Sequence, residues 1–373
     1  MKITRVETLY LRQPEVKFQC DSGQDALIVR VHTDAGITGI GEVDSAPLAA
    51  KAAIDGPFSH TTACGLGQLV LGEDPFETEK LWHKMYRGNI YGGRRGVGFH
   101  AMSGIDMALW DIKGKALGMP VWKLLGGGFC GKIRCYASSL WGATPEATYE
   151  LAGRYRDQGF TAVKFGWDPM GRDEATDIAL VREARRGLGE ANDLMIDAGL
   201  VWDAKTAIQR ARAFEPYHPF WLEEPLRPDD YEGYAKLSAA TDIRIAAGEE
   251  ESSRATFVEL MDRGRVDLIQ VDLTRCGGFT EAIKIAALAW DRGLPVANHG
   301  FTTYINVAAA LHFLASIPNA LICEFVAEEE TNLRESITKQ KLRAVDGCLA
   351  IPDAPGLGVD LDEEAIEPFL VRA

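Results

Sequence analysis

The fold is decided by four apolar runs within residues 161–249: TAVKFG (161–166), DLMIDAG (193–199), FWLEEP (220–225) and RIAAGE (244–249). They recur roughly every 25 residues, close to the length of one strand-plus-helix unit in an eight-unit barrel. Each run carries a polar residue at or near its end: Lys164, Asp197, Glu223 and Glu249. Because parallel barrel strands place their C-terminal ends on one face, we expect these side chains to meet at one site.

The same pattern extends outward on both sides. One similar run precedes these four and three follow: IRCYAS (133–138), DLIQVD (267–272), LPVANH (294–299) and ALICEF (320–325). Helical stretches such as DEATDIALVREARRGL (173–188) lie between the runs. Eight strands with seven intervening helices predict an α/β fold, a (β/α)7β-type modified TIM barrel whose last helix is replaced or altered.

Residues 1–125 do not follow the repeat and predict an α+β capping domain. Alternating polar and apolar residues predict antiparallel strands there, with a turn at residues 34–36. Ser103 is a candidate cap for a helix that ends at Gly118. We expect the barrel at residues 126–345, and the turn-rich tail at 346–373 should return to the capping domain and complete it.

The composition limits the partners and the location. The 373 residues carry a formal net charge of -14, which disfavours nucleic acid and anionic membrane as partners. A small anionic substrate stays compatible, because a bound divalent ion would invert the local field. We expect no signal peptide, because the first 18 residues lack its apolar run, and no membrane span, because no stretch of 18 apolar residues appears. The seven scattered cysteines suggest reduced, mostly buried thiols, so we expect a cytoplasmic protein.

Three of the polar strand ends have metal-ligand character: Asp197, Glu223 and Glu249 come from successive strands. Carboxylates that meet raise one another's pKa unless a cation lies between them. All-oxygen ligands suit a hard ion such as Mg2+. The alternative is that each acid pairs with a Lys or Arg at the barrel mouth, but three on consecutive strands favour a metal.

His299 and Asp272 end adjacent strands and could form an acid–base pair. A carboxylate on one imidazole nitrogen fixes the tautomer and leaves the other nitrogen as general base or acid. Glu324, one strand further, could hydrogen-bond a substrate carboxylate if it is protonated. The alternatives are a structural histidine in the VANHG turn and an acid that is paired for packing.

Motifs at these strand ends carry a family resemblance. They are Lys164-Phe165-Gly166, Asp197-Ala198-Gly199, Glu223-Glu224-Pro225, Gly248-Glu249, Asp272 followed by Cys276-Gly277-Gly278, and His299. Two longer stretches flank the barrel: SGIDMALWDIKGKALGMPVWKLLGG (103–127) and PDAPGLGVD (352–360). Together they resemble the enolase superfamily, mandelate racemase subgroup, and the resemblance covers nearly the whole chain.

The resemblance implies a cofactor and a chemistry. Mg2+, with Mn2+ as a substitute, would be held by Asp197, Glu223 and Glu249 and would bind a substrate carboxylate. A base would then remove the proton on the adjacent carbon, with Lys164 and Glu324 as electrostatic partners. Relatives also suggest a symmetric homo-oligomer.

One departure decides between reactions. The family's racemases commonly carry Lys-x-Lys at the end of the second barrel strand, and the second Lys is the base on one face. Here that position is Gly166. His299 oriented by Asp272 suits dehydration instead, because one residue can take the proton and return it to the departing β-hydroxyl.

The sequence and the resemblance together predict a lyase: a Mg2+-dependent dehydratase of a sugar acid, an aldonate or aldarate, that yields a 2-keto-3-deoxy acid. In having a histidine as its main candidate base, the chain resembles the acid-sugar dehydratases of that subgroup. One alternative is a racemase, epimerase or cycloisomerase of another carboxylate that uses Lys164 opposite His299. The other is a sugar-acid-binding protein without turnover.

Other candidates are weaker. Gly199 stands where relatives often place a side chain, so extra room is expected there. Glu250 and Glu251 fit a solvated helix start. The remaining polar candidates for a distal substrate group are Lys17, Asp21, His60, Arg94, Arg95 and His100, for most of which a structural role is equally compatible.

Overall fold

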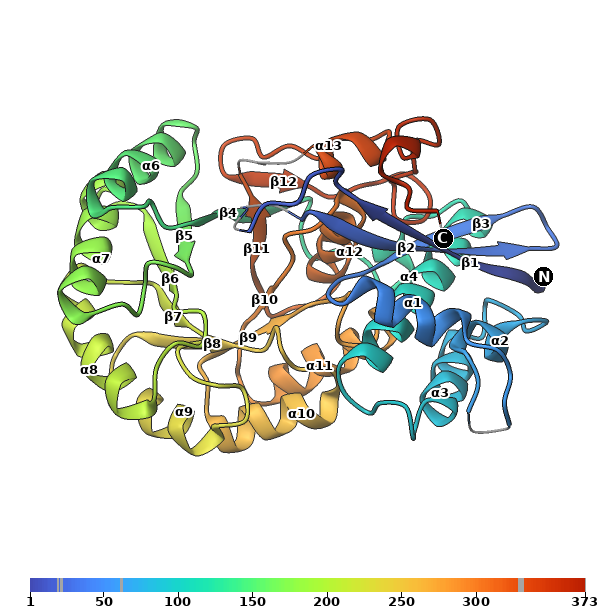
Figure 1. The fold of residues 1–373 in the computed structure, drawn as a ribbon, viewed down its shortest axis with the longest axis horizontal. Coiled ribbons are helices and arrows are strands. Elements are labelled where there is room, and N and C mark those ends of the chain that lie inside the picture. The colour runs from blue at the N-terminus through green and yellow to red at the C-terminus, as the bar shows by residue number, and fades with distance from the viewer. Residues whose placement is uncertain (19, 21–22, 61–62, 328–331, 373) are drawn as a thin grey trace.

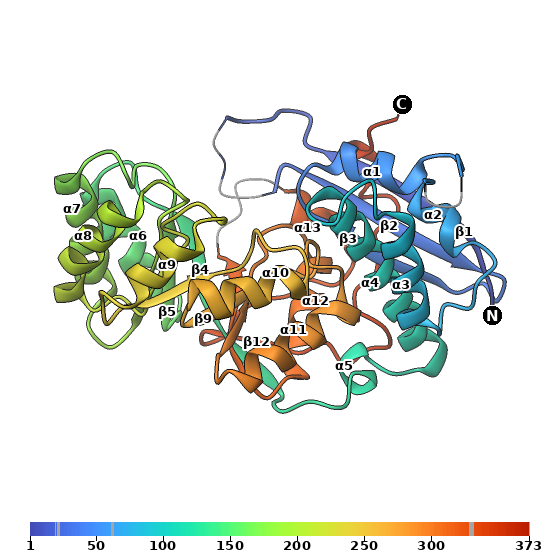
Figure 2. The ribbon, with the colours of Figure 1, turned by 90° about the horizontal axis from the view of Figure 1, so that it is seen from below.

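The chain folds into a barrel with a capping domain beside it (Figures 1 and 2). The computed structural model describes residues 1–18, 20, 23–60, 63–327 and 332–372. Its barrel consists of parallel strands in sequence order, and β11 pairs with β4 to close it. The strands are β4 Lys132–Leu140, β5 Ala162–Gly166, β6 Asp193–Asp197, β7 Trp221–Glu223, β8 Arg244–Ala247, β9 Leu268–Val271, β10 Val296–Asn298 and β11 Ala320–Val326.

A helix follows each of the first seven strands. These helices are α6 Pro145–Asp157, α7 Glu174–Leu188, α8 Ala204–Phe214, α9 Tyr231–Ser238, α10 Arg254–Glu259 with a π turn at Leu260–Gly264, α11 Phe279–Asp291 and α12 Tyr304–Ala315. Thr144, Asp173 and Asp203 cap three of them by accepting from the first-turn backbone. After β11 comes the short α13, Leu333–Ile337. The predicted (β/α)7β-type barrel is confirmed.

The barrel interior explains which side chains reach the mouth. One buried residue from each strand fills it: Tyr136, Ala162, Met195, Trp221, Ala246, Leu268, Ala297 and Ile322. Side chains two residues further along a strand point the same way. This alternation brings Lys164, Asp197, Glu223, His299 and Glu324 to the C-terminal mouth, and Asp272 two positions after Gln270.

Glu249 is an exception to this alternation, because it lies two residues after Ala247, whereas the interior residue of its strand is Ala246. Gly248, between Ala247 and Glu249, has a φ of 137°. A Cβ there would meet the Gln270 carbonyl oxygen at 2.6 Å, so the turn requires glycine.

The capping domain has a three-stranded antiparallel sheet in the order β1-β2-β3, as predicted, followed by five helices. Its elements are β1 Ile3–Arg12, β2 Asp25–Thr33, β3 Thr38–Val43, α1 Pro47–Asp55, α2 Leu66–Val70, α3 Thr78–Gly88, α4 Val97–Leu117 and α5 Val121–Leu124. The expectation that Ser103 caps a helix is wrong. Helix α4 begins six residues earlier, and the Ser103 hydroxyl donates to the Phe99 carbonyl and accepts from the Gly277 amide.

The tail returns to the capping domain, as predicted. Strand β12, Cys348–Ala350, first pairs antiparallel with β4. The Leu357 amide then donates to Asp111 Oδ1 of α4 at 2.9 Å, and the Val371 amide donates to the Tyr10 carbonyl. A 3-10 turn at Glu367–Phe369 lies just before that contact. The domain boundaries at 125/126 and 345/346 stay predictions.

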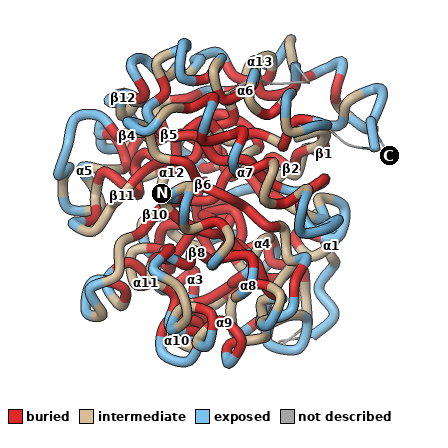
Figure 3. The backbone as a smooth tube through the Cα atoms, turned by 90° about the vertical axis from the view of Figure 1, so that its left-hand side faces the viewer, coloured by how far each residue is buried: buried red, intermediate tan, exposed pale blue. Residues whose placement is uncertain are grey.

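In Figure 3 buried residues gather toward the middle of the view and exposed residues lie mostly at its edge. One apolar cluster surrounds the barrel and extends to β1–β3, and a second lies between the capping sheet and its helices. Among the described residues, no helix has the length and apolar character that a membrane crossing requires. The seven cysteines are free, and three of them, Cys135, Cys276 and Cys323, are buried.

Candidate active site

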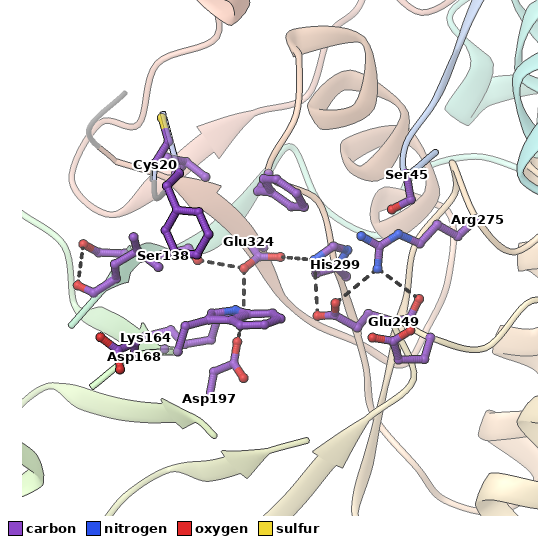
Figure 4. Close-up of a pocket in the computed structure, with 18 of the residues that line it drawn as sticks. Cys20, Ser45, Ser138, Lys164, Asp168, Asp197, Glu249, Arg275, His299 and Glu324 are labelled. Atoms are coloured by element: carbon purple, nitrogen blue, oxygen red, sulfur yellow. Dashed lines mark hydrogen bonds and ion pairs between the residues drawn. The ribbon is translucent and has the colours of Figure 1, made fainter. Parts of the chain in front are cut away.

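A cavity of about 530 Å³ opens at the barrel mouth, between the strand ends and two capping loops (Figure 4). Five residues predicted for the site line it: Lys164, Asp197, Glu249, His299 and Glu324. Glu223 and Asp272 lie directly behind, where they contact Lys164 and His299. The structure thus brings all seven together, while their catalytic and metal-binding roles stay predictions.

Lys164 is surrounded by carboxylates. Its Nζ lies 2.5 Å from Glu223 Oε1, 2.9 Å from Glu324 Oε1 and 3.8 Å from Asp197 Oδ2. Burial lowers the pKa of Lys164, but Glu223 and Glu324 outweigh it and raise that pKa well above its ordinary value. Lys164 is therefore a fixed positive charge at the centre of the site.

Glu324 is held as an anion. Burial raises its pKa, but Lys164 and then His299 outweigh burial and bring the pKa down to about 2. Ser138 Oγ and the Gly300 amide each donate to its carboxylate at 2.8 Å. With these donors around it the Glu324 carboxylate is an acceptor in this structure, and its expected hydrogen bond to a substrate carboxylate stays a prediction.

The remaining acids carry more negative charge than the nearby cations compensate. Burial, and then repulsion from Glu223, raises the pKa of Asp197 well above its ordinary value. Burial and then repulsion from Glu249 do the same for Glu224. Carboxylate oxygens of Glu224, Glu249 and Glu250 lie within 4.8 Å of one another.

The carboxylates of Asp197, Glu223, Glu224, Glu249 and Glu250 form a donor set that fits a hard divalent cation. It consists of oxygen atoms, it is largely buried, and a cation would relieve the repulsion that raises these pKa values. Of the predicted ligands, Glu249 belongs to the close group with Glu224 and Glu250, and the set Asp197, Glu223 and Glu249 stays a prediction. Glu224 and Glu250, which the sequence did not single out as ligands, add to the negative field at the same place.

His299 has the geometry of an oriented acid–base group. Its Nδ1 lies 2.7 Å from Asp272 Oδ2, while the Thr274 amide and hydroxyl hold Asp272 Oδ1. Its Nε2 lies 3.2 Å from Glu249 Oε2. Burial lowers the pKa of His299, but Glu249 leads the carboxylates that outweigh it and raise the pKa to about 9. Asp272 thus fixes one nitrogen and leaves the other facing the cavity.

Two glycines on the rim have different surroundings. Gly166 lines the cavity, and a Cβ there would lie 2.9 Å from both Cβ and Oδ2 of Asp197. Gly199 was expected to leave extra room. Instead the Trp167 ring fills that space, 3.3 Å from where a Gly199 Cβ would lie.

Some of the weaker candidates line the cavity and others do not. His100 lines the cavity, and so does Glu250. Glu251 is buried and its Oε1 accepts from the Tyr231 hydroxyl at 3.3 Å, so the expectation of a solvated helix start is wrong for it. Lys17, His60, Arg94 and Arg95 are not among the cavity-lining residues, and Asp21 lies outside the described residues.

The sequence-based reasoning missed several cavity residues. Arg275 bonds Glu249 and Asp44, and Trp167 and Ser138 form part of the wall. Arg275 could have been suspected, because it lies one turn after Asp272. Asp44 stands at the end of a capping strand, and nothing in the sequence connects it with residue 275.

Comparison with known proteins gives the family. Residues 3–126 match the family described as mandelate racemase / muconate lactonizing enzyme, N-terminal domain, and residues 147–365 match that described as enolase C-terminal domain-like. The chain belongs to the enolase superfamily. Both the resemblance to the mandelate racemase subgroup and the fold class are confirmed.

Individual relatives of this enolase-superfamily chain cover it almost completely. D-galactonate dehydratase of Xanthomonas oryzae pv. oryzae is 35% identical over 380 residues, 98% of the chain and 94% of that protein. D-galactarolactone cycloisomerase of Agrobacterium fabrum is 33% identical over 387 residues, 99% of each. The structure of 3,6-anhydro-D-galactonate cycloisomerase from Zobellia galactanivorans superposes with a TM-score of 0.90 at 34% identity and covers 100% of both chains.

Proposed function

We propose that the chain is a metal-dependent dehydratase of a sugar acid, an aldonate or aldarate. The observation that carries the proposal is an imidazole on the cavity wall that a carboxylate orients: His299 Nδ1 bonds Asp272 at 2.7 Å, and Nε2 faces the buried carboxylates. Gly166 offers no second base. The 35% identity to a D-galactonate dehydratase supports a sugar acid as substrate.

Asp197, Glu223 and Glu249 are proposed to hold Mg2+, for which Mn2+ could substitute. When bound, the ion would supply Lewis-acid stabilisation of the negative charge that develops on the substrate carboxylate. Lys164 contributes a permanent positive charge on the same side, since three carboxylates keep it protonated. Glu324 holds Lys164 in place and accepts from Ser138.

His299 carries the proton through both steps. Glu249 leads the carboxylates that raise the pKa of His299, so a cation bound to Glu249 would lower that pKa and leave Nε2 unprotonated. Nε2 then takes the proton from the carbon next to the carboxylate, and Asp272 stabilises the resulting imidazolium through Nδ1. The same nitrogen then returns the proton to the β-hydroxyl, which leaves as water. The resulting enol rearranges to a 2-keto-3-deoxy acid. One residue is sufficient if the proton and the hydroxyl leave from the same face.

A second candidate is a cycloisomerase, which two relatives with that name favour. The same elimination with a ring oxygen in the β position opens the ring without loss of water. A cycloisomerase mechanism that uses Lys164 as a second base has less support, because Lys164 makes three ion pairs with carboxylates. Free acids and their lactones or anhydro forms therefore belong in one substrate panel.

The test is incubation with Mg2+ and that panel, with semicarbazide to detect the 2-keto product and D2O to label exchanged positions. Dehydration predicts one water lost per turnover, and ring opening predicts a product of unchanged mass. Deuterium at an inverted α-carbon of recovered substrate would instead establish an epimerase or racemase.

The matched variant is His299→Asn, which we expect to lower kcat about 10²- to 10⁴-fold. His83→Asn is the control, since His83 is exposed and does not line the cavity. Wild-type turnover in His299→Asn would remove this residue from the mechanism. If the wild type binds no divalent ion, the proposed chemistry fails.

A further inference from the structure

Arg275 is a buried cation that the proposed chemistry leaves without a role. It lies in the turn between β9 and α11 and is 8% exposed. Its Nε and Nη2 donate to Asp44 Oδ2 at 3.0 and 2.7 Å, and its Nη1 donates to Glu249 Oε1 at 3.1 Å and to the Glu249 carbonyl at 3.3 Å. Asp272 Oδ2 is 3.8 Å from Nε. One guanidinium thus contacts three carboxylates from three separate elements.

One of these carboxylates comes from the capping domain. Asp44 directly follows β3 and is 231 residues from Arg275 in the chain. Its other oxygen, Oδ1, accepts from the Ser45 amide at 2.6 Å. Ser45 and Ala46 both have positive φ, at 63° and 50°, although neither is glycine. The backbone is therefore held in a strained turn that aims Asp44 into the barrel.

Arg275 also determines how Glu249 is turned. It bonds Oε1 and the backbone carbonyl of Glu249, which leaves Oε2 directed at His299 Nε2, 3.2 Å away. Figure 4 shows Arg275 and His299 both beside Glu249, with Ser45 above the guanidinium. A planar guanidinium presents its five donors in a fixed geometry, so it holds both acceptors in one set orientation, which the compact ammonium group of lysine does not impose.

We propose that Arg275 is a positioning residue that transmits the docking of the capping domain, through Asp44, to the orientation of Glu249 and of the Asp272–His299 pair. This inference rests on the proposed function, because it gives Glu249 and His299 their tasks. Its consequence is that the catalytic face is complete only when the turn after β3 is seated. The capping domain then contributes to catalysis through a barrel residue as well as by covering the substrate.

The test uses the full-length protein with Arg275→Lys, Asp44→Asn and the double variant. Arg30→Lys is the control, because Arg30 also bonds a carboxylate far away in the chain, that of Glu363, but does not line the cavity. The first readout is the affinity for Mn2+ alone, measured by electron paramagnetic resonance without substrate. The second is kcat and KM on the best substrate of the panel.

We expect Arg275→Lys to weaken Mn2+ binding about 10-fold or more and to lower kcat more than it changes KM. Asp44→Asn should reproduce part of both effects, and the double variant should be no worse than Arg275→Lys, because the two residues act as one unit. Arg30→Lys should match the wild type in both readouts. If Arg275→Lys does not fold, the same readouts on Asp44→Asn decide.

The inference is overturned if the variants keep wild-type Mn2+ affinity and kcat and lose only thermal stability. It is also overturned if Asp44→Asn and Arg275→Lys act additively, since that would mean independent roles. Failure of the proposed reaction is distinguishable. In that case the panel gives no product, while Mn2+ affinity still depends on Arg275 and Asp44.

Discussion

Acidification should destabilise the protein through one buried histidine, His312. It lies on α12 and is fully buried. Its Nδ1 accepts from the Trp122 amide at 3.3 Å, and its Nε2 lies 3.1 Å from the Leu357 carbonyl. The ring must be neutral with its proton on Nε2, because a second proton would face the Trp122 N–H. His312 thereby fastens both α5 and the C-terminal tail to the barrel.

The size of the effect follows from the pKa. Burial lowers the pKa of His312 from the ordinary 6.5 to about 4. Below about pH 6.5 the unfolded chain takes up a proton that the folded protein refuses, so stability falls until the pH reaches about 4. The difference of about 2.5 units corresponds to about 3 kcal/mol in total, of which about 2 kcal/mol is already lost at about pH 5.

The assay is urea unfolding at about pH 7 and about pH 5, for the wild type, His312→Gln and the control His83→Gln. The Gln side chain offers an acceptor and a donor but does not titrate. Acidic residues shift equally in all three proteins, so their contribution cancels. We expect the wild type and the control to lose about 2 kcal/mol more than His312→Gln between the two pH values. Equal losses in all three would refute the reasoning.

Two further substitutions address the proposed metal site. Lys164→Met leaves Glu223 and Glu324 buried without their cation and should lower the free energy of unfolding by about 3 to 5 kcal/mol in the absence of metal, measured with urea, and Mg2+ should restore part of the loss. Gly166→Ala places a Cβ 2.9 Å from Asp197 and should weaken Mn2+ binding about 10-fold; unchanged affinity would show that Asp197 can move aside or is not a ligand.

Much of the candidate site was predictable, because side chains alternate regularly along a barrel strand. Once the apolar runs are counted as parallel strands, the two-residue alternation determines which side chains point inward. That rule placed Lys164, Glu223, Asp272, His299 and Glu324 at one mouth without knowledge of any distance. The strand spacing itself came from a repeat visible in the sequence.

Protonation states were less predictable, because they depend on distances. Glu324 looked like a possible proton donor from its position alone. In the structure its oxygen lies 2.9 Å from Lys164 Nζ, and this contact lowers the pKa of Glu324 to about 2. Similarly, Gly199 suggested free space until the Trp167 ring was found beside it. No local pattern reports which side chain fills a gap left by a glycine.

Contacts between the domains were the least accessible. Asp44 and Arg275 are 231 residues apart, and neither lies in a periodic pattern that implies the other. Asp44 follows a strand whose sheet covers a helix and not the barrel interior, so its side chain could have faced solvent. The turn at Ser45 and Ala46, with two positive φ angles, directs it inward instead.

Gly166 matters for the position of Asp197 as well as for the absence of a second base. It is paired in register with Asp197 on the next strand, and no Cβ fits between them without displacing that carboxylate. A lysine at this position would therefore disturb a proposed metal ligand before it could serve as a base. The proposed single-base chemistry is thus supported by the way β5 and β6 meet as well as by the missing side chain, so restoring Lys-x-Lys alone should not produce a racemase.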